Sequence, residues 1–196
     1  MASKGFTLIE LMITIAIMAI ILAIAAPSFS QMLEKERLKT AASSVAEDLV
    51  FARNEAIRLN ASSYFTLETT GGWKYSICTA NGASSCNCTA TTSTTASNGT
   101  CKRLFTKAGS SWNNVSSDAS NFDSAFLFDP VNGMPRDTDG SKWADSGKKA
   151  LTLSSANGYE AHIAIGSSSR VKICTSSDDS KKLGSYPAVT DVEDCL

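Results

Sequence analysis

The chain has 196 residues, of which 43% are hydrophobic and 19% are charged, and its formal net charge is -1. This near-neutral balance argues against a protein that binds nucleic acid through bulk positive charge. The 12 glycines and 4 prolines are too few for a collagen-like or disordered chain. The hydrophobic residues are concentrated near the N-terminus, which argues against a simple soluble protein.

Residues 6–26 form an apolar run that holds one charged side chain, Glu10. About 20 apolar residues in a helix cross the ~30 Å hydrocarbon core of a bilayer, so we predict a transmembrane helix here. Lys4 is the one charged side chain before the run. The positive-inside tendency then places the N-terminus in the cytoplasm and the rest of the chain, with its cysteines, on the opposite side.

The segment Lys4–Glu10, Lys-Gly-Phe-Thr-Leu-Ile-Glu, resembles the class III signal of type IV pilins and type II secretion pseudopilins. The resemblance implies that a prepilin peptidase cuts the inner-membrane precursor between Gly5 and Phe6 and methylates the new N-terminus. Residues 1–5 are then a leader peptide that the mature subunit lacks.

In this family the residues that follow the cut, here 6–27, form the transmembrane and assembly helix. The resemblance implies that Glu10 neutralises the methylated amine of a neighbouring subunit and sets the assembly register. A charge inside a bilayer costs roughly 2.5 kcal/mol or more and therefore needs such a role. The alternative is that Glu10 lies near the lipid headgroups, where the helix N-terminus favours it. Pro27 is the other assembly residue, and its missing backbone donor is expected to kink or loosen the helix.

Residues 28–60 are expected to continue the helix into a globular head as an amphipathic segment. Residues 28–59 contain neither glycine nor proline, and Asn60 is the expected terminator. Four of the seven residues in the apolar stripe are small or β-branched, so we expect it to pack on a sheet and not in a coiled coil. The stripe recurs at steps of 4 and 3: Leu38, Ala42, Val45, Leu49, Ala52, Ala56 and Leu59.

Two phrases in this helix, Arg37–Ala42 and Asp48–Arg58, resemble the family that contains the minor pilins FimT and FimU and the minor pseudopilin GspH. The pattern L-x-x-A-R-x-E-A-I-R fits from Leu49 to Arg58. The resemblance implies an α+β, type IV pilin-like fold in which a long N-terminal helix packs on an antiparallel β-sheet head.

Residues 61–196 are expected to form that head from short strands. Asn157-Gly158 is a hairpin signal between two of them, and one sheet under the helix stripe is expected. The Ser/Thr-rich tract 79–100 is interpreted as an exposed insertion loop that disulfides hold in place. The expected strands are 63–68, 73–77, 125–128, 150–153, 159–165 and 170–174.

Six cysteines lie in the head: Cys78, Cys86, Cys88, Cys101, Cys174 and Cys195. No histidine accompanies them and their spacing is unlike that of zinc sites, so disulfides are favoured over a metal site. Six cysteines allow fifteen pairings. Direct closure between Cys86 and Cys88 would be strained, so Cys78 and Cys101 are the expected partners in either order. The resemblance to pilins, many of which close a C-terminal loop, implies that Cys174 pairs with Cys195.

Catalytic and metal sites are not expected. His162 is the only histidine, and no nucleophile-elbow motif accompanies it. Asp137–Gly140 resembles part of a calcium loop but lacks the third ligand in phase and the distal glutamate, so a polar turn is the better interpretation. We therefore expect no enzymatic activity, no metal and no cofactor.

FimT proteins of naturally competent bacteria carry a Gly-Arg-x-Arg motif that contacts DNA. The matching stretch here, Ser-Arg-Val-Lys, supplies Arg170 and Lys172, which would share one face of a strand. With Lys181 and Lys182 expected nearby, these cations could hold DNA phosphates weakly and in a salt-sensitive way. The alternative is a solvated strand face beside the aspartates at 178–179.

The sequence thus predicts a minor pilin of the FimT/FimU type that primes or caps a type IV pilus, for twitching motility or DNA uptake. The alternative within the family is a GspH-like minor pseudopilin of a type II secretion system. An alternative of another class is a membrane-anchored extracytoplasmic enzyme or binding domain with an uncut N-terminus. The expected partners are other pilins or pseudopilins, prepilin peptidase and the inner membrane. The head is expected in the periplasm or in the assembled fibre.

Overall fold

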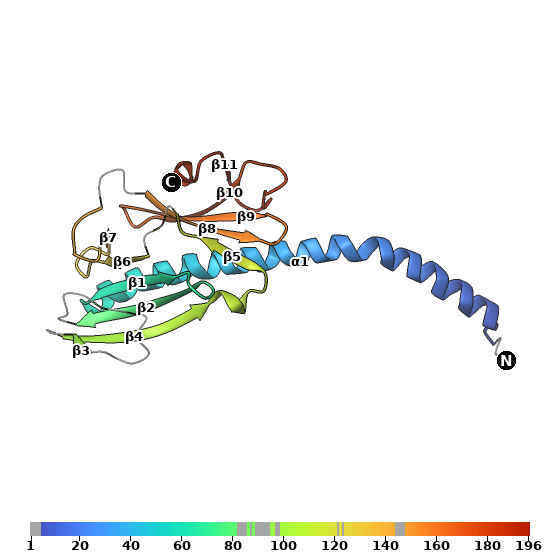
Figure 1. The fold of residues 1–196 in the computed structure, drawn as a ribbon, viewed down its shortest axis with the longest axis horizontal. Coiled ribbons are helices and arrows are strands. Elements are labelled where there is room, and N and C mark those ends of the chain that lie inside the picture. The colour runs from blue at the N-terminus through green and yellow to red at the C-terminus, as the bar shows by residue number, and fades with distance from the viewer. Residues whose placement is uncertain are drawn as a thin grey trace.

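The computed structural model describes residues 5–81, 86, 88, 95–96, 99–120, 122, 124–143 and 148–196. One long helix, α1 (Leu8–Leu59), projects far beyond a head built from two β-sheets (Figure 1). The N-terminus lies at the free end of this helix, and the C-terminus lies on the head. The chain is therefore an α+β protein in which about half of the helix lies outside the head.

Both ends of α1 are capped. Thr7 is the N-cap, and Asn60 is the C-cap in the left-handed conformation, with φ 48°. Asparagine tolerates this conformation well, so the helix ends where the sequence predicts. α1 passes Pro27 as one continuous helix and curves gradually along its projecting part (Figure 1).

The first sheet has six strands in the order β3-β4-β2-β1-β6-β7, all antiparallel to their neighbours. Its strands come from the middle of the chain, so most pairs are close in sequence. They are β1 (Ser62–Glu68), β2 (Lys74–Asn81), β3 (Thr95–Ala96), β4 (Gly99–Ala108), β6 (Ala125–Phe128) and β7 (Pro135–Arg136).

The second sheet has five strands in the order β11-β10-β9-β8-β5 and is antiparallel except for the β10–β11 pair. Two short 3-10 helices, η1 (Gly109–Ser111) and η2 (Val192–Cys195), complete the described elements. The strands are β5 (Val115–Asp118), β8 (Lys148–Ser155), β9 (Glu160–Gly166), β10 (Val171–Ser176) and β11 (Ala188–Val189).

The C-terminal part of α1 packs against strands of both sheets and so forms the centre of the core. Six of the seven predicted stripe residues are fully buried, which confirms the stripe. Leu59 is the exception, because it lies in the last turn, where the helix leaves the core, and it is 42% exposed. The small stripe residues let the helix approach the sheets closely, and aromatic side chains such as Phe65 and Tyr75 fill the remaining space.

Two expectations about the head are wrong. The strands form two sheets and not one. β10, β9, β8 and β5 pair in succession to make a sheet separate from the one that contains β1 and β2. The tract 79–100 is not all loop: its first residues extend β2 to Asn81, and its last belong to β3 and β4. Apart from Cys86, Cys88 and residues 95–96, the interior of this tract lies outside the described residues.

Candidate assembly site

We call residues 8–33 of α1 the free segment, because the large apolar side chains of this segment are exposed. Their exposure runs from 41% at Leu33 to 77% at Leu8. Among the described residues, α1 is the one helix long and apolar enough to cross a membrane, with a mean hydropathy of 2.8 over 18 residues. An apolar surface of this extent is not stable in water, so the free segment requires lipid or other helices around it.

Glu10 forms a capping box with Thr7 at the start of the free segment. The Thr7 backbone N–H donates to Glu10 Oε2 at 2.9 Å, and the Glu10 N–H donates to Thr7 Oγ1 at 3.3 Å. These bonds satisfy two backbone donors that the helix leaves unpaired. Within one chain, the carboxylate therefore has a local structural role. Its contact with a neighbouring amine stays a prediction.

The processing site is open. A Cβ added at Gly5 would have nothing within 4 Å, and Phe6 is 82% exposed. The folded chain itself therefore does not require glycine at position 5. Any requirement for glycine must come from an enzyme that binds this segment, which is consistent with the predicted cut between these residues.

A polar clamp holds α1 where it enters the head, and sequence reasoning missed it. Glu34 accepts hydrogen bonds from the backbone N–H of Asn157 at 2.8 Å and from its side-chain amide. Beside it, Lys35 Nζ lies 4.5 Å from the centre of the Tyr159 ring. Partial burial would raise the pKa of Glu34, but the hydrogen bonds from the β8–β9 turn outweigh it and lower that pKa.

A partly buried polar network ties the helix to the first sheet. The Tyr75 hydroxyl donates to Asp48 Oδ2 at 2.6 Å, and Lys107 Nζ lies 2.7 Å from the same oxygen. Lys107 also donates to Ser44 Oγ at 2.9 Å. Burial, followed by the Asp48 carboxylate, raises the pKa of Tyr75 far above its ordinary value, so the phenol stays a donor. The network fixes the rotation of α1 over the sheet.

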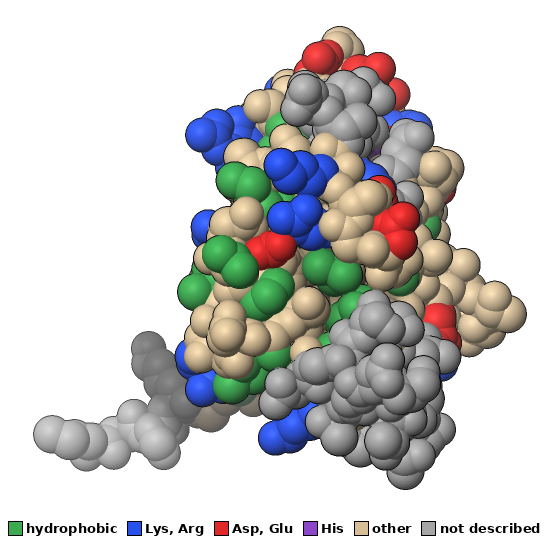
Figure 2. All heavy atoms as spheres, turned by 90° about the vertical axis from the view of Figure 1, so that its left-hand side faces the viewer, with side chains coloured by type: hydrophobic (Ala, Val, Ile, Leu, Met, Phe, Trp, Pro, Cys, Tyr) green, Lys and Arg blue, Asp and Glu red, His purple; other side chains and the backbone are tan. Residues whose placement is uncertain are grey.

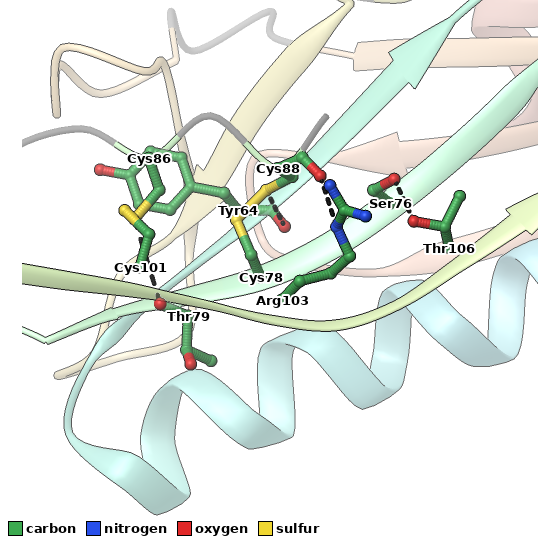
Figure 3. The surroundings of a disulfide bond; sticks show 9 residues. All are labelled: Tyr64, Ser76, Cys78, Thr79, Cys86, Cys88, Cys101, Arg103 and Thr106. Carbon is green, nitrogen blue, oxygen red and sulfur yellow. Dashed lines mark hydrogen bonds between the residues drawn. A yellow bond between two sulfur atoms is a disulfide. The ribbon is translucent and has the colours of Figure 1, made fainter. Parts of the chain in front are cut away.

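Three disulfides join all six cysteines. Cys78 pairs with Cys88, and Cys86 pairs with Cys101, so both bridges connect the β2–β4 region to the intervening tract (Figure 3). Arg103 on β4 donates from Nε to the Cys88 carbonyl at 2.9 Å (Figure 3). The third bridge joins Cys174 on β10 to Cys195 and so holds the C-terminal segment against this strand.

The four candidate DNA-binding cations do not form one cluster. Arg170 and Lys172 are exposed. They lie beside the Gly166 end of β9, because Val171 pairs with Ile165. Lys181 and Lys182 lie at the opposite end of that strand, where Lys181 forms an ion pair with Glu160 at 2.9 Å. On the face of the head opposite the N-terminus, Lys and Arg side chains are interspersed with Asp and Glu (Figure 2). This distribution does not form a broad basic surface.

The remaining sequence candidates have structural partners. His162 is 5% exposed with Nδ1 2.9 Å from Thr152 Oγ1, and burial lowers its pKa. In the Asp137–Gly140 segment, Asp139 Oδ1 accepts from the Ser141 N–H at 2.8 Å and so closes a polar turn. Within the described part of the chain, no three His, Cys, Asp or Glu side chains gather as metal ligands.

Comparison with known families agrees with this geometry. Residues 1–26 match the family model of the prokaryotic N-terminal methylation motif, and residues 41–185 match that of the type II transport protein GspH. The chain belongs to the GspH family. This GspH-family chain is a membrane-anchored pilin-type subunit, with the free segment as its anchor and the head outside the cytoplasm. Such subunits are processed at the methylation motif and assemble with other pilins or pseudopilins.

Two solved structures similar to the GspH-family chain are crystal forms of the type IV minor pilin FimU of Pseudomonas aeruginosa PAO1. The first has a TM-score of 0.49 and 15% identity and covers 76% of this chain and 93% of FimU. The second has a TM-score of 0.46 and 14% identity and covers 74% and 94%. No curated protein matches the chain significantly.

Proposed function

We propose that the chain is a minor pilin of the FimT/FimU type, incorporated in few copies into a type IV pilus, where it primes or caps assembly. The free segment carries this proposal. An apolar helical segment with exposed side chains, continuous with a helix that packs inside a folded head, is the shape that a subunit needs to pass from a bilayer into a fibre core. The methylation motif at its start supports a cut after Gly5.

The mechanism of the proposed minor pilin is assembly and not catalysis. Lipid tails are about as apolar as a fibre core, so moving the free segment between them gains little from the hydrophobic effect, and close packing drives association. A charge is different, because its cost in an apolar medium falls only when a partner charge neutralises it. Glu10, paired with the amine of a neighbouring subunit, therefore selects one register among many of similar packing energy.

A second candidate is a minor pseudopilin of a type II secretion system, and the match of residues 41–185 to the GspH family model favours it. Both candidates use the same anchor and the same assembly chemistry. They differ in the fibre that receives the subunit, so the discriminating measurement is made on the fibre.

The test is deletion of the gene, complementation with the full chain, and mass spectrometry of sheared fibres. The minor-pilin proposal predicts loss of surface pili and twitching, with secretion intact and a methylated Phe6 at the N-terminus of the fibre-borne chain. Loss of exoprotein secretion with normal piliation would favour the pseudopilin instead. An intact Met1 in assembled fibres would refute both, and an uncut chain that stays in the membrane and is absent from fibres would favour an anchored binding domain or enzyme.

A further inference from the structure

The outer edge of β10 is open along most of its length. β11 pairs only with the end of this strand, where Ala188 faces Thr175 and Val189 faces Ser176. Pro187 ends β11 at this point, since proline has no N–H to donate to a ladder. Along Val171–Cys174, no described strand continues the sheet. This leaves four residues, or about 13 Å at ~3.3 Å per residue, of uncovered edge.

The direction of the backbone groups follows from the register. The Gly166 N–H donates to the Arg170 carbonyl at 3.1 Å, so residues 170, 172 and 174 point their polar backbone groups toward β9. Residues 171, 173 and 175 point their backbone N–H and C=O groups outward. Accordingly, the Thr175 N–H donates to the Pro187 carbonyl oxygen at 2.9 Å. The outward N–H and C=O groups of Val171 and Ile173 form no backbone hydrogen bond with another described residue.

An apolar groove lies directly beside this edge. It is lined by Val171 and Ile173 from β10 and by Ala46 and Val50 from α1, with Glu47 at its rim. Val50 is 44% exposed, and the two β10 side chains are half-buried at the margin of the core. A strand added to β10 would place every second side chain into this groove.

The other face of the same edge carries two exposed cations. Lys172 is exposed there and Arg170 precedes it, and neither forms an ion pair or side-chain hydrogen bond with another described residue. A segment suited to this edge therefore alternates apolar residues, which face α1, with acidic residues, which face Lys172.

The position of the groove on α1 indicates the source of such a segment. Val50 lies 18 residues after Met32, which is five turns of 3.6 residues, so both lie on the same side of the helix. Met32 belongs to the free segment and is 61% exposed. A subunit that packs against that side of the free segment can therefore reach the open edge of β10.

We propose that the Val171–Cys174 edge of β10 receives an extended, alternating apolar and acidic segment of another subunit of the same fibre, which adds to the second sheet as a strand. The inference rests on the proposed assembly into a fibre. The added strand satisfies the outward backbone groups of Val171 and Ile173, fills the groove beside Val50 and pairs an acidic side chain with Lys172. Lysine on an exposed edge also deters unwanted pairing, and an acidic partner overcomes this barrier.

The test uses the full chain in cells that make the fibre, with the photo-crosslinker p-benzoylphenylalanine in place of Val50. We expect a cross-link to an extended segment of another fibre subunit, mapped by mass spectrometry. Lys172→Glu should reduce its yield about threefold, because like charges then face each other. Ile173→Pro should abolish it, because proline removes the outward donor. The same crosslinker at Val131, which is 82% exposed on the β6–β7 loop, is the matched control and should not give this adduct.

The outcomes separate this inference from the proposed function. Absence of the processed chain from fibres would refute the proposed function and the edge interaction with it. A processed chain in fibres without a Val50 adduct, or with an adduct to a neighbour's N-terminal helix, would overturn the edge interaction alone. An adduct insensitive to Lys172→Glu and Ile173→Pro would do the same. An adduct that falls about threefold in Lys172→Glu and disappears in Ile173→Pro, with no such adduct from the crosslinker at Val131, would support it.

Discussion

The two ends of α1 are parts of one helix with opposite surroundings. In the free segment, every large apolar side chain is exposed, whereas the stripe residues from Leu38 to Ala56 are fully buried between two sheets. Helix propensity is therefore not what separates them. The packed end is stabilised by its own chain, and the free end by lipid or by other subunits. One helix thus joins a protein core that the chain makes alone to a core that only an assembly makes.

The largest expected effect is loss of fibre assembly through a substitution in the free segment. Glu10→Ala should leave membrane insertion intact, since it removes a charge from an apolar medium, but should abolish incorporation into fibres. Immunodetection of the full chain in membrane and sheared-fibre fractions measures both. Glu10→Gln is a useful control because it keeps side-chain acceptor capacity for the capping box. Normal assembly of either variant would contradict the charge-neutralisation role.

A matched pair of leucines sharpens the comparison. Leu49→Ala removes a fully buried side chain and should destabilise the head by about 3 kcal/mol. Leu22→Ala, at a position that is 61% exposed in the free segment, should leave the unfolding of the head unchanged. Chemical denaturation of the full chain in detergent, followed by tryptophan fluorescence, compares the two. Equal losses would mean that the free segment contributes to the folding of the head.

A smaller effect is expected at the clamp between the two ends. The pKa of Glu34 is lowered in the folded chain, so its contribution is fully present above the unfolded value of about 4.3 and is lost as pH falls through the folded value. Glu34→Gln should therefore remove part of the acid-sensitive stability, on the order of 0.5 kcal/mol, because the site is solvent-screened. Glu47→Gln, on the same helix, is the control. If the parent chain and Glu34→Gln have identical melting curves from pH 3 to pH 7, a range of about four units, the clamp does not contribute to acid-sensitive stability.

The smallest effect concerns the surface of the head. If Arg170 and Lys172 hold DNA phosphates, replacing both with alanine should lower the salt slope of DNA binding by about two units. The free energy of unfolding of the head should change by less than about 0.5 kcal/mol, because both side chains are on the surface. Fluorescence titration of the full chain in detergent at two salt concentrations tests this, after the Cys174–Cys195 bridge is verified in the variant. Absence of binding by the parent chain at low salt would refute a direct role in DNA capture.

Local sequence patterns predicted much of the helix and several strands. The stripe from Leu38 to Ala56 repeats at helical spacing, and 125–128 coincides with β6. β4 escaped prediction because its Lys and Arg residues interrupt the apolar alternation, and its pairing with β2 decides its conformation. The division into two sheets depends on non-local pairing, such as that of Val115 with Ser155, which periodicity does not contain.

The candidate site shows the same limit. The cleavage motif and Glu10 are contiguous in sequence, and the Thr7-x-x-Glu10 capping box could have been read from the same letters. The clamp could not, because Glu34 and Asn157 are 123 residues apart and meet only when the β8–β9 turn is built. Likewise, Asp48 gains its role from Tyr75 and Lys107, which two different strands bring to it.

The disulfides have a mechanical consequence. They join cysteines that are 10, 15 and 21 positions apart within the β-rich part of the head, and none of them crosses from α1 to a sheet. A pull along the fibre axis enters the head through α1 and loads the seam between helix and sheets in shear. Covalent bonds stiffen the outer shell of the head, while the seam resists through noncovalent contacts alone: side-chain packing, the Glu34–Asn157 clamp and the Asp48–Tyr75–Lys107 network. Under tension, the noncovalent seam would yield before the disulfide-bonded shell, so a reductant would weaken the shell and leave the seam's resistance to shear unchanged.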